Sequence, residues 1–323
     1  MKAAVHTKYG PPDVVSLAEV AKPSVGDKDV LVAVHATTVN RTDCAYRAAR
    51  PFFVRTMTGL TRPKRTILGT EFAGVVAEVG KDVSTFAVGD RVFGYNEGPF
   101  GTHAEFLALP ADAPVAKIPD GVPFATAAAA TEGAHYALAF IRVAGTKAGQ
   151  DVLVYGATGG IGSAAVQLLK TLDVTVTAVC DTANLELVKG LGADEVLDYT
   201  TGEFDNHTRT YDAVFDAVGK STFGRCKRLL KPAGGAYLSS ELGPWAQNLL
   251  LALTTSVRKS KVKFPFPKQD QRMMELLGGL LESGAFRPVI DRHYPLAEIV
   301  DAYTYVETGR KIGNVVIDVV PAS

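Results

Sequence analysis

The sequence predicts an α/β protein of two parts, an irregular and largely antiparallel β-domain followed by a doubly wound parallel sheet. Residues 1–120 carry short apolar runs broken by glycine, proline and aspartate, a pattern typical of short strands joined by turns. From residue 121 onward, strand-like runs alternate with helical stretches, which is the order of βαβ units. The length of 323 residues fits two domains, at about 100–200 residues for each.

In the first part, we expect short strands at residues 30–34, 72–79, 89–94 and 102–107. The second part opens with an alanine-rich helix over residues 124–144 that stops at Gly145. The strands expected after it are residues 151–155, 174–179, 195–197, 213–216 and 235–238. The helices between them are expected at residues 161–172, at 185–191 and in a stretch ending at 230.

The C-terminal tail breaks this alternation. It shows two helical stretches, 273–281 and 296–306, and a final strand at 314–319. We expect this strand to complete the first domain. The predicted division is therefore 1–120 for the β-domain, 121–262 for the parallel-sheet domain and 263–323 for the return to the first.

Composition and charge exclude several classes of protein. Thirty-four basic residues balance thirty-four acidic ones, so no net charge attracts the chain to nucleic acid. The three cysteines are far apart in sequence, which excludes a disulfide framework and a closely spaced cysteine zinc site. The first residues lack the apolar stretch of a signal peptide. We therefore expect a reduced, cytoplasmic protein.

A glycine cluster gives the first indication of function. The run Tyr155-Gly156-Ala157-Thr158-Gly159-Gly160-Ile161-Gly162 follows a predicted strand and opens a predicted helix. Residues without a β-carbon permit the tight turn and let the backbone approach a pyrophosphate, and the free N–H groups at the helix start face its charge. The sequence thus predicts a dinucleotide site at Gly156, Thr158, Gly159, Gly160, Ile161 and Gly162.

The identity of the dinucleotide stays open at this point. Asp181 follows the next strand at about the distance where an acid usually binds the ribose hydroxyls of NAD. Alternatively, Cys180, Thr182 and Asn184 serve an adenosine phosphate of NADP, without a nearby Arg or Lys. The competing interpretation is that Asp181 is a loop or helix-cap residue with a purely structural role. Tyr199 is expected to cover the adenine.

Three more motifs make the chain recognisable. They are Asn40-Arg41-Thr42-Asp43, Gly69-Thr70-Glu71-Phe72-Ala73-Gly74 and Val88-Gly89-Asp90-Arg91-Val92. With the glycine cluster, the chain resembles the zinc-free quinone oxidoreductase branch of the medium-chain dehydrogenase/reductase superfamily, from residue 1 to about 320. The resemblance implies a GroES-like catalytic domain and a Rossmann domain joined by a cleft, a homodimer, and a slight preference for NADP(H) over NAD(H).

The chain departs from the zinc enzymes of this superfamily at their ligand positions. The resemblance places Asn40, Thr70 and Thr131 where those enzymes have cysteine, histidine and a second cysteine or acid. An amide and two hydroxyls are poor substitutes for thiolate and imidazole ligands. We therefore expect no zinc.

Without a Lewis acid, the expected reaction is hydride transfer to a quinone or to the activated C=C bond of an α,β-unsaturated carbonyl. The expected donors around the acceptor oxygen are Asn40, Thr42 and Thr131. The resemblance also places His135 and Asn314 near the nicotinamide, although packing roles compete for both. Two rivals remain, a zinc-type alcohol dehydrogenase with an unusual site and a nucleotide-binding structural or regulatory protein without turnover.

Two stretches of the chain are rich in basic residues. Between Arg47 and Arg65 lie six cations, no acid and the pair Phe52-Phe53. This stretch is a solvated loop, a lid over the substrate site or a weak contact with an anionic membrane. The stretch 245–263 is interpreted first as a subunit contact. Neither stretch has the aromatic spacing of a nucleic-acid platform.

Overall fold

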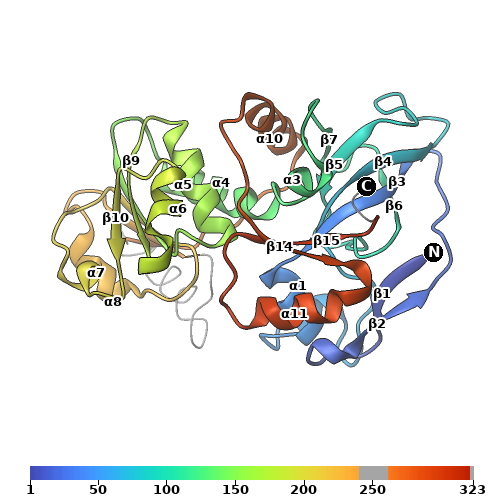
Figure 1. The fold of residues 1–323 in the computed structure, drawn as a ribbon, viewed down its shortest axis with the longest axis horizontal. Coiled ribbons are helices and arrows are strands. Elements are labelled where there is room, and N and C mark those ends of the chain that lie inside the picture. The colour runs from blue at the N-terminus through green and yellow to red at the C-terminus, as the bar shows by residue number, and fades with distance from the viewer. Residues whose placement is uncertain (240–260, 321–323) are drawn as a thin grey trace. The chain divides into compact units, whose positions relative to one another are not determined.

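The computed structural model describes residues 1–239 and 261–320, and it separates into two units (Figure 1). Unit 1 comprises Met1–Glu132 with Gln269–Ser323, and unit 2 comprises Gly133–Lys268. The expected boundaries after residues 120 and 262 differ from this division. Most of the predicted subunit-contact stretch, residues 245–260, lies outside the described residues.

The main sheet of unit 1 collects strands from both ends of the chain. Its strands are β3 (Asp29–Val39), β4 (Glu71–Val79), β5 (Arg91–Tyr95), β6 (Phe106–Pro110), β7 (Val115–Lys117), β14 (Ile290–Pro295) and β15 (Asn314–Asp318). They are ordered β14-β15-β3-β4-β5-β7, and β6 also pairs with β3. A separate antiparallel pair is formed by β1 (Lys2–His6) and β2 (Val15–Glu19). The antiparallel pairing of β15 with β3 confirms that the final strand returns to the first domain.

Helices cover this sheet and connect its strands. They are α1 (Arg41–Ala48), α2 (Val54–Thr58), α3 (Phe124–Ala128), α10 (Gln271–Ser283) and α11 (Ile299–Glu307), with 3-10 turns η1 (Pro12–Val14) and η5 (Leu296–Glu298). Figure 1 shows α1 and α11 side by side. The buried Arg47 of α1 pairs with Glu307 and lies 4.9 Å above the Tyr303 ring, which ties the two helices together. α3 contacts β3, β4 and β5, so unit 1 extends beyond residue 120.

Unit 2 is the predicted doubly wound parallel sheet. Its strands are β8 (Asp151–Tyr155), β9 (Thr175–Cys180), β10 (Glu195–Asp198), β11 (Ala213–Asp216), β12 (Ala236–Ser239) and β13 (Val262–Lys263). They are ordered β10-β9-β8-β11-β12-β13, and all five pairs of neighbours in this order are parallel. The strand order reverses beside β8, and ligands of such sheets bind at this switch point, outside the carboxyl ends of the strands.

The helices of unit 2 follow the strands in alternation. They are α4 (Glu132–Ala144), α5 (Gly160–Lys170), α6 (Leu185–Gly190), α7 (Glu203–Asn206) and α8 (Phe223–Cys226), with 3-10 turns η2 (Thr182–Asn184) and η3 (Lys227–Leu229). The apolar core against the sheet includes Leu153, Val179, Val214 and Tyr237. Among the described residues, no helix has the length and apolar character that crossing a bilayer requires.

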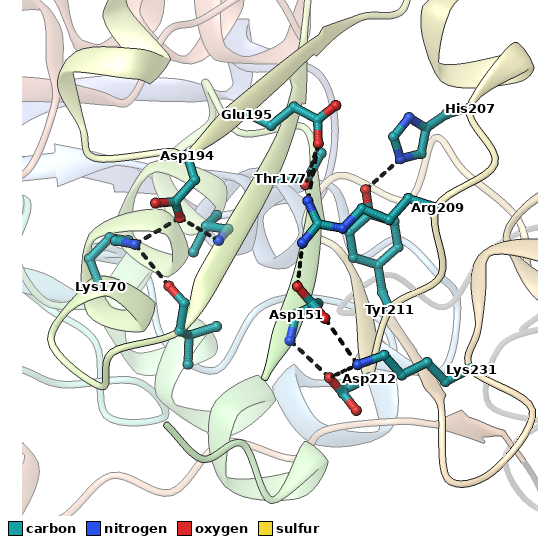
Figure 2. Close-up of polar contacts among 12 residues, drawn as sticks. Asp151, Lys170, Thr177, Asp194, Glu195, His207, Arg209, Tyr211, Asp212 and Lys231 are labelled. Carbon is teal, nitrogen blue, oxygen red and sulfur yellow. Dashed lines mark hydrogen bonds and ion pairs between the residues drawn. The ribbon is translucent and has the colours of Figure 1, made fainter. Parts of the chain in front are cut away.

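Figure 2 shows a charged network at the amino ends of the unit 2 strands. The Asp151 N–H, at the start of β8, donates to Asp212 at 2.8 Å. Lys231 donates to Asp151 at 3.0 Å and to Asp212 at 2.7 Å, and Arg209 pairs with Asp151 from another side. These charged groups pair with one another, so we assign this edge of the sheet a role in stability. The carboxyl edge carries the glycine cluster.

Three expected elements differ from the observed ones. The expected helix 124–144 is interrupted, because Thr131 and Glu132 donate their N–H groups to the Glu71 side chain and a new helix starts there. The expected strand 102–107 is shifted to β6, and of its first residues only Ala104 makes an isolated bridge, with Ala3. The helical stretch expected to end at residue 230 is short, consisting of α8 and η3.

Candidate functional site

The glycine turn of unit 2 has the backbone geometry that a phosphate cradle requires. Gly156 has φ +80, a conformation that L side chains rarely adopt. A β-carbon on Gly162 would lie 2.1 Å from the Gly156 carbonyl oxygen, so the start of α5 packs directly on the turn. Gly159 is the N-cap residue and no side chain caps the helix. The helix start therefore presents its N–H groups without a competing side-chain acceptor.

The start of α4 lies against this turn. A β-carbon on Gly133 would approach the Gly160 carbonyl oxygen to 2.5 Å. His135, predicted near the nicotinamide, lies two residues further along α4 and is buried, with its ring 5.4 Å from the Tyr136 ring. His135 thus belongs to the same unit as the glycine turn.

The other predicted cofactor residues of unit 2 gather at the carboxyl edge of the sheet. Asp181 follows β9, and the Asn184 amide donates to its carboxylate at 2.5 Å. The Thr182 hydroxyl donates to Asp198, the last residue of β10. Tyr199 follows Asp198 and is 47% exposed, with its ring 6.5 Å from that of Tyr155. The amide and hydroxyl expected to serve a phosphate of NADP therefore already donate to carboxylates.

Asn314 lies in the other unit. It begins β15, and both its backbone N–H and its side-chain amide donate to the Val289 carbonyl oxygen, at 2.8 and 3.0 Å. The Asn314 side chain thus bonds the backbone of the residue that precedes β14 in unit 1.

A buried polar cluster in unit 1 contains the predicted catalytic residues. Asn40 is the N-cap of α1, where its side-chain oxygen accepts from the Asp43 N–H at 2.9 Å and Asp43 accepts from the Asn40 N–H. The Asn40 amide donates to the Thr70 hydroxyl at 2.8 Å. The Asn40 amide also hydrogen-bonds the Glu71 side chain, so both of its hydrogens are engaged within the chain.

Glu71 is the centre of this cluster. One carboxylate oxygen accepts from the Thr131 N–H at 3.2 Å, the Thr131 hydroxyl at 2.8 Å and the Glu132 N–H at 2.6 Å. The other oxygen accepts from the Thr38 hydroxyl. Burial raises the pKa of Glu71, and these donors oppose the rise. Because the Thr131 hydroxyl donates to Glu71, its proton is already engaged within the chain.

Two ionisable residues beside this cluster were missed by the sequence analysis. Burial raises the pKa of Glu132 well above the ordinary glutamate range, and the Glu71 charge adds to the rise. The Thr42 side chain is a hydrogen-bonding neighbour of Glu132, and Lys311 is its nearby cation. Burial lowers the pKa of Lys311. The available signal was an acid inside the alanine-rich stretch 124–144, where a purely structural helix has no need of one.

Asp43 and His103 are also buried in unit 1. Asp43 accepts from the Asn40 N–H at 3.1 Å and the Gly69 N–H at 3.2 Å, so its carboxylate bonds backbone. His103 contacts Thr38 O at 2.8 Å and Asp43 at 3.8 Å. Burial lowers the pKa of His103 to about 4 and raises that of Asp43 well above its usual range. His103 is therefore a neutral donor, and its contact with Asp43 is not an ion pair.

A cavity of about 300 Å³ lies in unit 1. Its lining includes Tyr9, Tyr46, Met57, Lys64, Arg65 and Phe100. The Tyr46 and Phe100 rings meet edge to face with centroids 4.6 Å apart. Burial, more than the neighbouring Glu97, raises the pKa of Tyr46 to about 12. Aromatic walls of this kind suit a planar molecule.

The side chains at the expected metal-ligand positions do not fit zinc. Asn40 donates to Thr70, and Thr131 donates to Glu71. Neither an amide N–H nor a hydroxyl that already donates its proton supplies the sulfur or imidazole ligands of zinc sites. Within residues 1–239 and 261–320, no three His, Cys, Asp or Glu side chains are grouped as metal ligands.

Comparison with known proteins agrees with the two-unit fold. Residues 26–120 match the family model of the alcohol dehydrogenase GroES-like domain, and residues 191–317 match that of the zinc-binding dehydrogenase. The chain is 33% identical over 333 residues to 2-methylene-furan-3-one reductase of Solanum lycopersicum, covering 99% of this chain and 80% of that protein. The chain belongs to the zinc-free quinone oxidoreductase branch of the medium-chain dehydrogenase/reductase superfamily.

Further members of the superfamily resemble this chain over nearly its whole length. An NADPH-dependent alkenal/one oxidoreductase of Arabidopsis thaliana is 31% identical, over 99% of this chain and 80% of that protein. Among solved structures, the quinone oxidoreductase from Coxiella burnetii superposes with a TM-score of 0.88 at 27% identity, covering 99% of both chains. The GroES-like and Rossmann architecture expected from the motifs is confirmed.

Proposed function

We propose that the protein is a zinc-independent, NAD(P)H-dependent oxidoreductase that reduces quinones or the activated C=C bond of α,β-unsaturated carbonyls. The observation that carries this proposal is the pairing of a dinucleotide-type glycine turn in unit 2 with a buried amide, hydroxyl and carboxyl cluster in unit 1. That cluster offers proton donors and lacks soft metal ligands. The names of the relatives, an alkenal/one oxidoreductase and a quinone oxidoreductase, support the same reaction class.

The residues of unit 2 are suited to hold the dinucleotide. The N–H groups at the start of α5 would bind the pyrophosphate, and the groups after β9 and β10 would face the adenosine. When bound, the reduced nicotinamide supplies the hydride. Gly159 leaves space for the pyrophosphate at the start of α5, because the nearest heavy atom to an added β-carbon would be 3.6 Å away.

In unit 1, we assign the Thr42 hydroxyl as the donor to the acceptor oxygen, and we assign the Asn40 amide, which bonds Thr70 and Glu71, to positioning Glu71. Addition of hydride to the β-carbon of an enone moves an electron pair onto this oxygen, and preorganised donors stabilise the resulting enolate. The Thr131 hydroxyl positions Glu71 instead, because its proton is already donated. Of the three expected residues, we therefore assign Thr42 to the substrate.

Glu132 is the proposed proton source. Its raised pKa keeps the carboxyl group protonated when ordinary glutamates are ionised. The carboxyl would pass its proton to the Thr42 oxygen while the Thr42 hydroxyl passes its own to the acceptor. The product then carries one hydride and one proton, and Glu132 is left as a carboxylate beside Lys311.

Steady-state oxidation of NADPH and NADH with a panel of quinones and alkenals tests the proposal. We expect turnover that survives treatment with a chelator and is not increased by added zinc. Dinucleotide binding without turnover of any acceptor would favour the non-enzymatic role. Activity that requires zinc would favour the alcohol dehydrogenase.

For the choice of dinucleotide, we propose NADPH. The name of the Arabidopsis relative, an NADPH-dependent alkenal/one oxidoreductase, supports it. The carboxylates of Asp181 and Asp198 make NADH the competitor, since they repel a 2′-phosphate. Dissociation constants measured by nucleotide fluorescence decide this point. Tighter binding of NADH would reverse the choice and leave the reductase proposal intact.

We further propose a homodimer and a cytoplasmic location. The dimer is an implication of the superfamily, and light scattering measures it directly. Cys44, Cys180 and Cys226 are all buried and free, which supports a reducing compartment. A monomer in solution would overturn the assembly proposal.

A further inference from the structure

The segment of residues 50–65, here called the basic segment, exposes an unusual amount of apolar surface. Phe52 is 73% exposed, Phe53 49%, Met57 65% and Leu60 67%. These four fall within nine successive residues, although the described part of the chain has only eleven exposed large hydrophobic residues. Such a concentration marks an interaction surface, whereas scattered apolar residues do not.

The same segment is positively charged throughout. Its cations are Arg50, Arg55, Arg62, Lys64 and Arg65. The nearest acids along the chain, Asp43 and Glu71, are fully buried. None of the ion pairs between described residues involves the five cations of the segment. Their charge is therefore available to an anionic partner.

Internal contacts hold the segment in one conformation. The Tyr9 hydroxyl contacts the Thr58 hydroxyl and the Gly59 carbonyl oxygen, both at 2.7 Å. The Lys64 N–H donates to the Thr58 carbonyl oxygen at 2.8 Å. Arg55 lies 4.8 Å from the Tyr9 ring and 5.5 Å from the Phe52 ring. A surface ordered in this way loses little conformational entropy on binding.

We propose that the basic segment docks on an anionic phospholipid bilayer. Exposed aromatic and aliphatic side chains enter the boundary between headgroups and acyl chains, while Lys and Arg meet the lipid phosphates. Stable peripheral binding requires two such signals together. A lid over the cavity would bury Phe52 and Phe53, but both are exposed here. A plain solvated loop has no need of four exposed hydrophobic residues.

The docked surface would also bring the cavity next to the membrane. Met57, Lys64 and Arg65 belong to the basic segment and also line the cavity. If the proposed reductase function holds, apolar acceptors dissolved in the bilayer would reach it without crossing water. The docking itself does not depend on catalysis.

Cosedimentation with lipid vesicles tests the proposal on the full chain. One set of vesicles is phosphatidylcholine alone, and the other contains phosphatidylserine in addition. We expect binding to the anionic vesicles that weakens with salt, and little binding to the neutral ones. At about a fivefold loss of affinity per removed cation, the double variant Arg62→Gln/Lys64→Gln should bind about 25-fold more weakly. Phe52→Ser/Phe53→Ser should lose at least about tenfold.

Matched variants away from the segment serve as controls. Val88→Ser removes a side chain that is 64% exposed, and Lys28→Gln removes an exposed cation. Both should bind anionic vesicles like the wild type. Circular dichroism and the melting temperature verify that all variants fold. Vesicle binding is measured without substrate, so the result does not depend on enzymatic turnover. Equal binding to neutral and anionic vesicles, or full binding by both double variants, would overturn the proposal. A changed acceptor KM without any vesicle binding would also overturn it, in favour of a lid.

Discussion

Glu71 shows how a single buried carboxylate organises its surroundings. It accepts two backbone N–H groups and two hydroxyl groups from Thr38, Thr131 and Glu132, and its side chain is fully buried. Charge-assisted hydrogen bonds of this kind contribute more than neutral ones, and leaving a buried donor unpaired costs free energy. The geometry of this buried cluster therefore depends on Glu71.

Replacing Glu71 by glutamine should destabilise the fold. The glutamine NH₂ group would face donors on at least one side, so we expect a loss of about 1–3 kcal/mol in the free energy of unfolding. Glu78 lies on the same strand but is exposed in its pair with Lys22. Glu78→Gln should stay within about 0.5 kcal/mol of the wild type. Urea unfolding of the two variants measures the difference, and equal stabilities would contradict the central role of Glu71.

Glu132→Gln tests the proposed proton source. The variant keeps the size of the side chain but has no acidic proton, so we expect kcat to fall by about 100-fold. In the wild type, kcat should decline as the pH rises through the raised pKa of Glu132, because only the protonated form donates. This decline should be absent from the variant. A variant with wild-type kcat and an unchanged pH profile would exclude Glu132 as the donor.

At the scale of elements, two glycines in the turn between β8 and α5 have different surroundings. Gly162 has no room for a β-carbon, since the Gly156 carbonyl oxygen would lie 2.1 Å away. At Gly159 the nearest atom would be 3.6 Å away and φ is −73. The two glycines therefore serve different purposes, although they look alike in sequence.

This difference predicts opposite outcomes for two alanine variants. Gly162→Ala should lower the melting temperature, because the backbone of the turn must shift. Gly159→Ala should leave the melting temperature unchanged and weaken NADPH binding by at least about tenfold, because the methyl group occupies the place of the pyrophosphate. Differential scanning fluorimetry and nucleotide titration measure both quantities. Unchanged binding in Gly159→Ala would place the dinucleotide elsewhere.

Local pattern predicted most elements of unit 2, because its buried strands and glycine turn are contiguous in sequence. The helix expected over 124–144 could not be predicted correctly, since its interruption depends on Glu71, a residue about sixty positions earlier. Part of the candidate site likewise could not be predicted from local pattern. Asn40 and Thr131 were identified from motifs, whereas Glu132 and Lys311 become notable only when tertiary contacts bury their charges.

At the scale of the whole molecule, His103 links folding to pH. Its pKa is about 4 in the folded chain, against an ordinary value of 6.5, because it is buried. Between these values the unfolded state binds the proton and the folded state does not, so stability falls as the pH falls from 6.5 toward 4. His103 should contribute a loss of about 2 kcal/mol between pH 7 and pH 5.

His103→Gln isolates this contribution. Glutamine can still donate to the Thr38 carbonyl oxygen but does not titrate, so the stability of the variant should depend less steeply on pH. Urea unfolding of the wild type and the variant at the two pH values gives the difference. Parallel pH profiles would show that His103 titrates normally in the folded chain.

The central claim is that the protein transfers a hydride from a nicotinamide cofactor without the help of zinc. The most direct measurement uses chelator-treated protein, NADPH deuterated at C4 of the nicotinamide and an α,β-unsaturated ketone, followed by NMR of the product. We expect deuterium on the β-carbon of the saturated ketone. A product without deuterium, or product formation only after zinc is added back, would contradict it.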